Sequence, residues 1–295
     1  MKNSTKRRFI QVAAAAIMNG YVAGFMKGKI YKGNLKTACL PVLNCYSCPG
    51  AVGSCPIGSL QSILSGRKHK VSFYVLGFLM LFGVLFGRLI CGLLCPFGFI
   101  QDIIYKIPFS KIRLLKKIDN PLRYLKYAVL LFLVILMPIF IRDEFGSGTT
   151  YFCKLICPAG TLEGGFPLLI KNESLRMAAG TLFKWKVFIL AITILLSIVI
   201  YRPFCKYLCP LGAFYSLFNK VSFYQLSIDR DKCTGCKQCE KNCKMGVNIT
   251  KDINSPECIR CGECIDICSS HAITIKSNIL IKKDMKCSKN KSVEI

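Results

Sequence analysis

Two cysteine runs near the C-terminus have the residue type and spacing of iron–sulfur ligands. Residues 233–243 and 258–268 each contain four cysteines in the pattern C-x2-C-x2-C-x3-C. In bacterial iron–sulfur proteins this run places three thiolates around one [4Fe–4S] cluster, and its fourth cysteine ligates the other cluster. We therefore predict two cofactor sites. Site 1 comprises Cys233, Cys236, Cys239 and Cys268, and site 2 comprises Cys258, Cys261, Cys264 and Cys243.

The residues around these runs bear on the prediction, because a zinc ribbon also uses paired cysteines. Eight cysteines in two equal runs favour two clusters over zinc. Gly235 and Gly262 allow the backbone to approach the sulfides of a cluster. The proline that usually follows the fourth cysteine is replaced by Lys244 and Ser269. These replacements affect the expected loop geometry but not the number of ligands.

A second cysteine pattern repeats through the rest of the chain. The sequence Cys-Pro-x-Gly occurs four times, and in three copies another cysteine precedes it by four residues. Two thiols four residues apart on a helical turn face the same way, so each pair supplies half of a four-thiolate site. The alternation of the copies indicates two pseudo-repeated halves. The copies start at Cys55, Cys95, Cys157 and Cys209, and the preceding cysteines are Cys91, Cys153 and Cys205.

Two of these pairs are expected to meet at the inner face of a membrane. We call this set the inner site, and it comprises Cys91, Cys95, Cys205 and Cys209. Free buried cysteines are common in protein cores. Two copies with the same trailing Pro-x-Gly favour a shared iron–sulfur cluster instead.

Six further thiols form an outer group, which is more than one cluster needs. The group comprises Cys39, Cys45, Cys48, Cys55, Cys153 and Cys157. By analogy with the inner site, Cys153, Cys157, Cys55 and one of Cys45 or Cys48 would hold a cluster. The remaining two would then form a disulfide on the oxidising side. Alternatively, the four cysteines between residues 39 and 55 would hold a cluster alone.

Four apolar runs are the elements that position these cysteines. They cover residues 9–26, 71–90, 124–141 and 183–201, in a chain of 295 residues that is 53% hydrophobic. About 20 apolar residues cross the hydrocarbon layer, and lysines at the ends reach its interface. We therefore predict a membrane all-α domain with four transmembrane helices in two pseudo-repeated halves. The last two runs have shorter apolar centres, which would also suit a buried helix of a soluble protein.

Four spans place both chain termini on the same side of the membrane. Lys and Arg are nearly equal in number on the two sides, so the positive-inside rule does not choose an orientation. We place the termini in the cytoplasm, where iron–sulfur clusters are normally assembled. The predicted division is a membrane domain over residues 1–224, an α+β ferredoxin domain with two [4Fe–4S] clusters over 225–280, and a basic tail over 281–295. Cys287 in this tail is expected to be a free thiol.

Composition and charge exclude several other classes of protein. Lys and Arg number 41 and Asp and Glu 15, and clusters with thiolate ligands offset part of this positive excess. The remainder suits an anionic lipid surface or an acidic redox partner, and no stripe of bases indicates nucleic acid. His69 and His271 lie outside the apolar runs, which excludes haem held by histidine pairs. No glycine motif for a nucleotide is present.

These motifs resemble those of the membrane polyferredoxin family, which includes NapH-type, NosR-type and CcoG-type proteins. The shared pattern is four spans, C-x3-C-P repeats and a C-terminal pair of ferredoxin runs, and it covers about residues 5–275. The resemblance implies that Cys91/Cys95 and Cys205/Cys209 take part in electron transfer near the inner face. The sequence departs from the NapH-type pattern in its outer cysteines, especially over residues 43–50. A quinol dehydrogenase role therefore does not carry over directly.

The sequence predicts a multi-pass iron–sulfur protein of the cytoplasmic membrane that passes electrons between a cytoplasmic or quinol donor and an extracytoplasmic acceptor. Its cofactors would be two [4Fe–4S] clusters in the ferredoxin domain and one or two further clusters in the membrane domain. No residue resembles a catalytic nucleophile or general base. We expect an electron-transfer subunit of an oxidoreductase system, with redox proteins such as a flavoprotein or reductase subunit as partners. The alternatives are a membrane redox sensor and a redox-active assembly or metal-handling protein, for which eight Met and two His provide few copper ligands.

Overall fold

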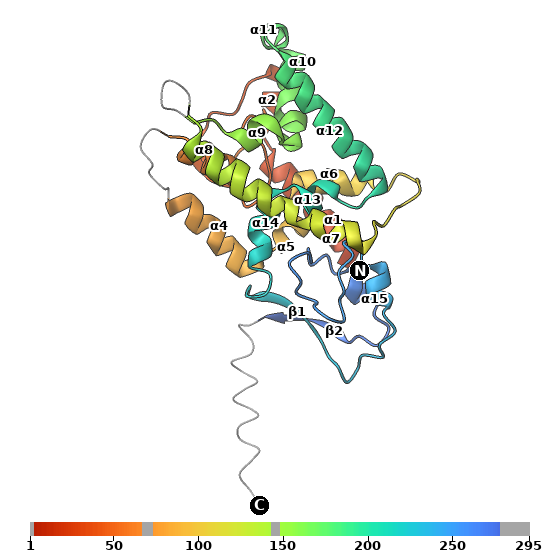
Figure 1. Cartoon of the computed structure of the whole chain (residues 1–295). Helices are drawn as coiled ribbons and strands as arrows, with labels where there is room; N and C mark the ends of the chain where they lie inside the picture. Colours follow the sequence, from red (N-terminus) through yellow and green to blue (C-terminus); the bar gives the residue numbers. More distant parts are fainter. Residues whose placement is uncertain (1–2, 67–72, 143–147, 278–295) are drawn as a thin grey trace, which may run out of the picture.

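The computed structural model describes residues 3–66, 73–142 and 148–277. Helices make up most of this part of the chain (Figure 1). The predicted basic tail with Cys287, the end of the predicted ferredoxin domain and the first residues of the second apolar run lie outside the described residues.

The elements follow one another in a single long series. Up to residue 140 they are α1 (Asn3–Met18), α2 (Val22–Lys27), the 3-10 helix η1 (Asn34–Thr37), α3 (Pro56–Leu64), α4 (Phe73–Phe86), α5 (Leu89–Leu93), α6 (Pro96–Ile104), α7 (Lys116–Ala128), the π-helix η2 (Val129–Leu136) and α8 (Met137–Phe140). After residue 150 they are α9 (Tyr151–Leu155), the π-helix η3 (Gly160–Gly165), α10 (Phe166–Lys171), α11 (Glu173–Met177), α12 (Thr181–Val199), α13 (Pro203–Tyr207), α14 (Pro210–Leu217), β1 (Tyr224–Ile228), α15 (Gln238–Asn242), α16 (Glu263–Ile267) and β2 (Ile273–Ser277).

Two helical segments within the described residues are long and apolar enough to cross a membrane. One is the continuous 25-residue helix Lys116–Phe140, and the other is the 19-residue helix Thr181–Val199. They correspond to the third and fourth predicted spans. The second predicted span contains the shorter apolar helix α4, with 14 residues.

The first predicted span is interrupted between α1 and α2. The backbone N–H of Tyr21 donates to the Gly50 carbonyl at 3.1 Å, and this contact turns the chain out of the helix. A Cβ atom at Gly24 would overlap the Pro49 carbonyl oxygen, so glycine allows the close approach of α2 to the loop that contains the outer cysteines. The continuous apolar run over residues 9–26 gave no sign of this break.

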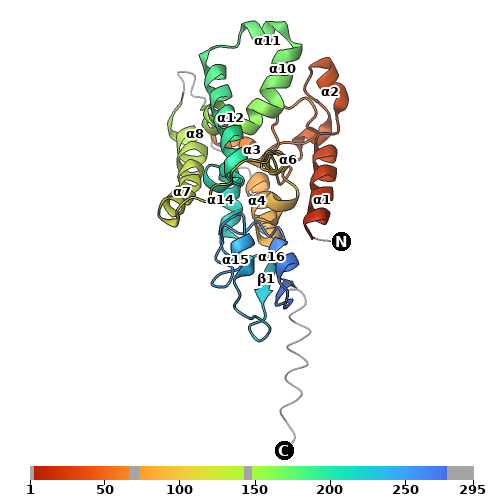
Figure 2. The same cartoon turned by 90° about the vertical axis from the view of Figure 1, so that its right-hand side faces the viewer.

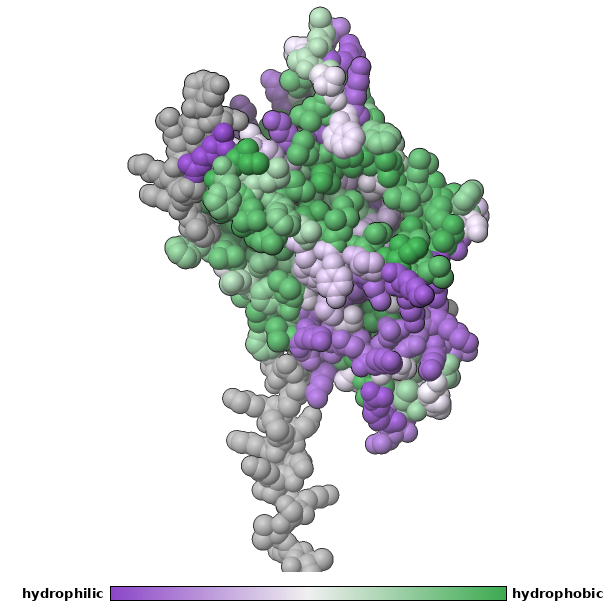
Figure 3. All heavy atoms as spheres, in the orientation of Figure 1, coloured by the Kyte–Doolittle hydropathy of each residue, from purple (hydrophilic) through white to green (hydrophobic). Residues whose placement is uncertain are grey.

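A broad apolar surface covers α4, the Lys116–Phe140 helix and α12 (Figure 3). Its large exposed side chains include Phe73, Leu81, Leu131, Phe132, Phe188 and Leu195. An exposed apolar surface of this extent is typical of contact with lipid or with another protein. The hydrophilic surface in the same view gathers toward the end that carries the C-terminal domain.

The C-terminal domain is built around a two-stranded antiparallel sheet, in which Tyr224 pairs with Ser277 and Ile228 with Ile273. Its core consists of side chains from β1, β2 and the cysteine loops, with Met245, Val247, Ile249, Ile259 and Ile273 buried. Figures 1 and 2 show this domain at one end of the helices, with α10 and α11 at the opposite end.

Ion pairs and hydrogen bonds join the C-terminal domain to the helices. The backbone N–H of Asn3 donates to Asp266 Oδ1 at 3.1 Å, which places the start of α1 against α16. Arg88 at the end of the second apolar run forms an ion pair with Glu257 at 3.1 Å. The start of α1 therefore lies beside the C-terminal domain (Figure 1).

Candidate iron–sulfur centres

The fold brings the four inner-site cysteines together from two distant parts of the chain. All four thiols line one small cavity of about 10 Å³. Cys91 lies on α5 and Cys205 on α13, whereas Cys95 and Cys209 are the N-cap residues of α6 and α14. Each cysteine is at most 8% exposed. The structure therefore brings the two cysteine pairs together around one cavity, as the repeat predicts.

The Cys-Pro-x-Gly sequence has a local structural reason. Proline suits the first turn of a helix, because its fixed φ and missing N–H cost nothing there. The N–H groups of Gly98 and Gly212, the third residues of α6 and α14, donate to Cys95 Sγ at 3.4 Å and Cys209 Sγ at 3.3 Å. Each motif therefore aims a backbone N–H at its own sulfur, and such hydrogen bonds tune a cluster held by that sulfur.

Two buried arginines link the halves of the inner site. Arg88 Nη2 donates to the Cys205 carbonyl at 3.1 Å, and Arg202 Nη1 donates to the Cys91 carbonyl at 2.6 Å. Each arginine precedes the first cysteine of its own pair by three residues and reaches the other pair. This role was not predicted from the sequence, although both halves share the spacing Arg-x-x-Cys-x-x-x-Cys-Pro, which is a usable signal.

The positive charges of these arginines affect the pKa of the inner-site thiols. Burial raises the pKa of Cys91, and the charges of Arg88 and Arg202 oppose that rise. Burial likewise raises the pKa of Cys205, again opposed by both arginines. Because clusters bind thiolates and not thiols, the two cations favour the ligating form of the inner cysteines.

Five of the six outer cysteines line a second, larger cavity, and four of these lie closest to one another. Burial, followed by the thiols of Cys153 and Cys45, raises the pKa of Cys55 to about 12. A Cβ atom at Gly160 would lie 3.5 Å from Cys45 Sγ and 3.8 Å from Cys157 Sγ. Cys45, Cys55, Cys153 and Cys157 therefore form the set that we call the outer site.

The two remaining outer cysteines, Cys48 and Cys39, each hydrogen-bond to a polar side chain, and Cys48 alone is outside the cavity lining. Cys48 Sγ donates to Asn19 Oδ1 at 3.5 Å and does not line the outer cavity. Cys39 lines the cavity, where its sulfur accepts a hydrogen bond from Ser54 Oγ at 3.7 Å. Both are free thiols in the described chain, so no disulfide pairs them. Burial raises the pKa of Cys55, Cys153 and Cys157, and the thiol of Cys45 lies close enough to add to the rise in each. Ala51 stands where the repeat would place a cysteine four residues before Cys55.

Two glutamines show that the sites follow one plan. Gln101 Nε2 donates to Cys205 Sγ at 3.2 Å, and Gln61 Nε2 donates to Cys153 Sγ at 3.5 Å. Gln101 follows Cys95 by six residues and Gln61 follows Cys55 by the same number. Neither glutamine was predicted to contact a cysteine, although both lie three residues beyond the glycine of a Cys-Pro-x-Gly copy.

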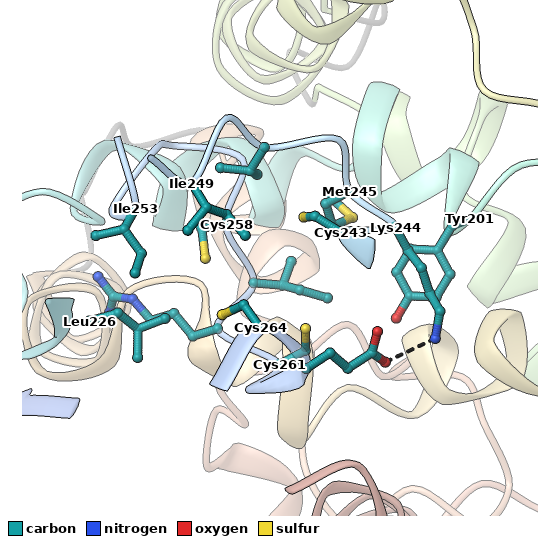
Figure 4. A pocket seen from close by; sticks show the side chains of 14 residues that line it. Tyr201, Leu226, Cys243, Lys244, Met245, Ile249, Ile253, Cys258, Cys261 and Cys264 are labelled. Atoms are coloured by element: carbon teal, nitrogen blue, oxygen red, sulfur yellow. Dashed lines mark hydrogen bonds and ion pairs between the residues drawn. The ribbon is translucent and has the colours of Figure 1, made fainter. Parts of the chain in front are cut away.

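The cysteines of site 2 line one cavity of about 30 Å³ in the C-terminal domain (Figure 4). In each run, the two residues that flank the second cysteine have a positive φ. They are Gly235 and Lys237 in one run, and Arg260 and Gly262 in the other. The two runs thus share a backbone conformation that curls around a central group. The site 2 cysteines are Cys243, Cys258, Cys261 and Cys264.

Site 1 lies nearer to solvent than the other three sites. Cys236 is exposed, and Cys233, Cys239 and Cys268 are half-buried. Burial raises the pKa of Cys264 in site 2, and the thiol of Cys239 contributes to that rise. The two C-terminal sites are therefore electrostatic neighbours.

The donor sets consist of cysteine sulfur alone, which suits iron–sulfur clusters. All 18 cysteines of the described chain are free. Within those residues, no three His, Cys, Asp or Glu side chains converge tightly enough to hold one metal ion. A cubane separates its four thiolate ligands more widely than a single ion does, and sulfur-only donor sets suit it.

Comparison with known families agrees with these donor sets. The chain matches the family described as "4Fe-4S binding domain" over residues 71–117 and 185–225. It matches the family described as "4Fe-4S dicluster domain" over residues 225–269. The first match contains all four inner-site cysteines, and the second contains sites 1 and 2.

Several curated proteins are similar along most of their length. An uncharacterized protein of Methanocaldococcus jannaschii is 32% identical over 65% of this chain and 73% of its own length. The ferredoxin-type protein NapH of Escherichia coli is 26% identical over 75% of this chain and 73% of its own. The methylamine utilization ferredoxin-type protein MauN of Paracoccus denitrificans is 28% identical over 80% and 74%.

The chain belongs to the NapH-type membrane polyferredoxin family. With two candidate membrane helices and these relatives, it is an iron–sulfur protein of electron transport that is associated with a membrane. No solved structure matches this polyferredoxin.

Direct contacts connect site 2 of the polyferredoxin to the inner site. Gly92 lies between Cys91 and Cys95, and a Cβ atom there would overlap the carbonyl oxygen of Ile259. Ile259 itself lies between Cys258 and Cys261 of site 2. The ligand loops of the two sites therefore touch, backbone against backbone.

A single loop also separates the inner site from the outer site. Leu43 is 2% exposed and lines both cavities. Burial raises the pKa of Tyr215, and thiols of both sites, Cys91 and Cys55, add to that rise. The four sites of the polyferredoxin thus form one series: site 1, site 2, the inner site and the outer site.

Proposed function

We propose that this chain passes electrons across the cytoplasmic membrane, between a cytoplasmic or quinol donor and an extracytoplasmic acceptor. The observation that carries the proposal is the series of contacts from site 2 through Gly92 to the inner site, and through Leu43 to the outer site. A hydrocarbon layer of about 30 Å is too wide for one electron transfer step, and sites in series divide it.

The proposed ligands are four sets of four cysteines. They are site 1 (Cys233, Cys236, Cys239, Cys268), site 2 (Cys243, Cys258, Cys261, Cys264), the inner site (Cys91, Cys95, Cys205, Cys209) and the outer site (Cys45, Cys55, Cys153, Cys157). When bound, iron–sulfur clusters would supply one-electron redox chemistry at potentials set by their surroundings.

Buried ion pairs fix the position of site 2 relative to the inner site. Glu257 precedes Cys258 and pairs with both Arg88 and Lys126, whose side chains are fully buried. Buried pairs of this kind are costly to break, because the partner is left as an unpaired charge. They would therefore keep the site 2 loop seated against the inner site.

The contact between α1 and α16 supports placing the start of the chain and the ferredoxin domain on the same side of the membrane. We propose four membrane segments from the apolar runs at residues 9–26, 71–90, 124–141 and 183–201, the first of them broken between α1 and α2, with both termini in the cytoplasm. The start of α1 is bonded to α16, so the N-terminus and the ferredoxin domain share one end of the molecule. An even number of spans requires that arrangement. Sites 1 and 2 then face the cytoplasm, and the outer site faces the opposite side.

An assembly or metal-handling role and a membrane redox sensor are the competing functions. Neither requires a continuous series of sites from one end of the molecule to the other. The surroundings of the outer site contain no His or Met among the described residues of the cavity, so the preferred soft ligands for copper are limited to cysteine.

Reconstitution in liposomes tests the proposal. Anaerobic vesicles with a low-potential reductant outside and a trapped redox dye inside should show reduction of the dye only when the protein is present. Protein orientation is determined by protease access to the ferredoxin domain. An intact protein with all four clusters that reduces no trapped dye in either orientation would refute electron transfer across the membrane.

A further inference from the structure

The outer cavity is far larger than the space around the other sites. Its volume is about 1170 Å³, whereas the cavities at the inner site and site 2 have about 10 Å³ and 30 Å³. Small-molecule sites in proteins have volumes of about 300–1000 Å³. The outer cavity therefore has room for a bound molecule beside the outer cysteines.

The charged side chains that line this cavity share one sign. Within the described residues they are Lys32, Lys36 and Lys186. The Nζ of Lys36 is already engaged, because it donates to the Ala51 carbonyl at 2.7 Å and lies 4.9 Å from the centre of the Tyr46 ring. Lys186 is half-buried on α12. Burial and the Cys45 thiol raise the pKa of Cys153 to about 11, and the charge of Lys186 opposes that rise. A half-buried cation beside a redox site attracts an anion.

Aromatic and polar groups complete the lining. The rings of Tyr31, Tyr46 and Tyr74 border the cavity, and Tyr46 and Tyr74 are 54% and 56% exposed. Asn44 is fully buried in the lining, and its Oδ1 has no hydrogen-bond partner in the described structure. Exposed rings offer stacking surfaces, and an unpartnered amide oxygen accepts a hydrogen bond from a ligand N–H.

We propose that the outer cavity binds a redox-active aromatic anion of the flavin mononucleotide class, with its phosphate near Lys186 and its ring system near the tyrosines. This proposal rests on the proposed function and names the acceptor at the outer site. Full reduction of an oxidised flavin adds two electrons and two protons. The electrons come from the soluble low-potential reductant, which is oxidised by the same number, and the protons come from water.

The test is equilibrium binding of two flavins to the full-length protein in detergent, with its clusters intact and no reductant present. FMN and riboflavin share the ring system, and only FMN carries the phosphate. We expect saturable binding of FMN, detected by quenching of its fluorescence, with affinity at least tenfold higher than that of riboflavin.

Lys186→Gln should reduce the affinity for FMN about tenfold and leave the affinity for riboflavin unchanged. Lys184→Gln is the matched control, because Lys184 is exposed on the same helix and does not line the cavity. It should leave both affinities unchanged. Iron content and the visible absorbance of each variant verify that the clusters remain.

Three results would overturn the site: no saturable FMN binding, equal affinity for FMN and riboflavin, or equal effects of Lys186→Gln and Lys184→Gln. Because the assay contains no reductant, its outcome does not depend on electron transfer. FMN binding without reduction of a trapped dye would refute the electron conduit and retain the site. Dye reduction without FMN binding would refute the FMN site and retain the electron conduit.

Discussion

The inner and outer sites are two versions of one design with different exposure. Each combines two Cys-Pro-x-Gly copies and a glutamine that donates to a cysteine sulfur of the partner copy, at 3.2 Å in the inner site and 3.5 Å in the outer site. The inner site is closed, with a cavity of about 10 Å³, and two arginines cross between its halves. The outer site opens into about 1170 Å³ and has lysines in its lining.

The difference follows from a few replaced residues. The outer site has Ala51 where the repeat expects a cysteine, and Cys45 from a loop takes its place. Thr150 stands three residues before Cys153, where Arg88 and Arg202 stand in the inner site. A closed, cation-bridged site suits a relay between other sites, whereas an open one suits exchange with an external molecule.

The largest expected effect comes from removing both halves of the inner site. Cys91→Ser combined with Cys205→Ser should abolish reduction of a trapped dye and lower the iron content from about 16 to about 12 per chain. The EPR signals of the two ferredoxin-domain clusters should remain. Unaltered dye reduction by this variant would show that the inner site is no part of the path.

The next test compares two cysteines in the same outer loop. Cys45→Ser should lose about four iron atoms and most dye reduction, because Cys45 belongs to the outer set. Cys48→Ser is the matched control and should keep both, since Cys48 points to Asn19. Equal loss of iron in both variants would contradict the assignment of Cys45 as the fourth ligand.

A smaller effect is expected at the contact between site 2 and the inner site. Gly92→Ala adds a methyl group that overlaps the Ile259 carbonyl oxygen, and overpacking of this kind costs about 1–3 kcal/mol. Dye reduction should slow several-fold while iron content stays constant, as measured by stopped-flow absorbance.

Gly77→Ala provides the control, because a Cβ atom there meets no other atom within 4 Å. It should leave the rate of dye reduction unchanged and raise helix stability by up to about 1 kcal/mol. If Gly77→Ala and Gly92→Ala slow the reaction equally, the Gly92–Ile259 contact has no special role.

The smallest effect on transfer is expected from Asp102→Asn, which removes the carboxylate partner of Arg202. Burial by itself would raise the pKa of Asp102, but the charge of Arg202 and its hydrogen bonds lower it from 3.8 to about 2. The ionised carboxylate should therefore contribute about 2 kcal/mol to stability.

That contribution is fully present above pH 3.8 and is lost as the pH falls through about 2. The difference in unfolding free energy between the two proteins should thus be constant from pH 5 to pH 8, as measured by denaturant unfolding in detergent. A difference that changes across this range would indicate another titrating group.

Several features were predictable from the sequence because they depend on local spacing. The two ferredoxin runs, the Cys-Pro-x-Gly repeat and the inner-site set Cys91, Cys95, Cys205 and Cys209 follow from residue type and separation along the chain. Proline at the first helical position and glycine two residues later define each helix start without any distant contact. The family and its iron–sulfur chemistry were likewise predicted from these patterns.

Tertiary structure decided what depends on distant contacts. The break after α1 arises because Tyr21 bonds to Gly50, and Cys45 joins the outer site because its loop packs against η3, where its N–H donates to Glu163 at 2.9 Å. Arg88 and Arg202 acquire their roles only when the two halves meet. Local spacing fixes which thiols face the same way, but only packing decides which pairs meet, which sites touch, and which one remains open.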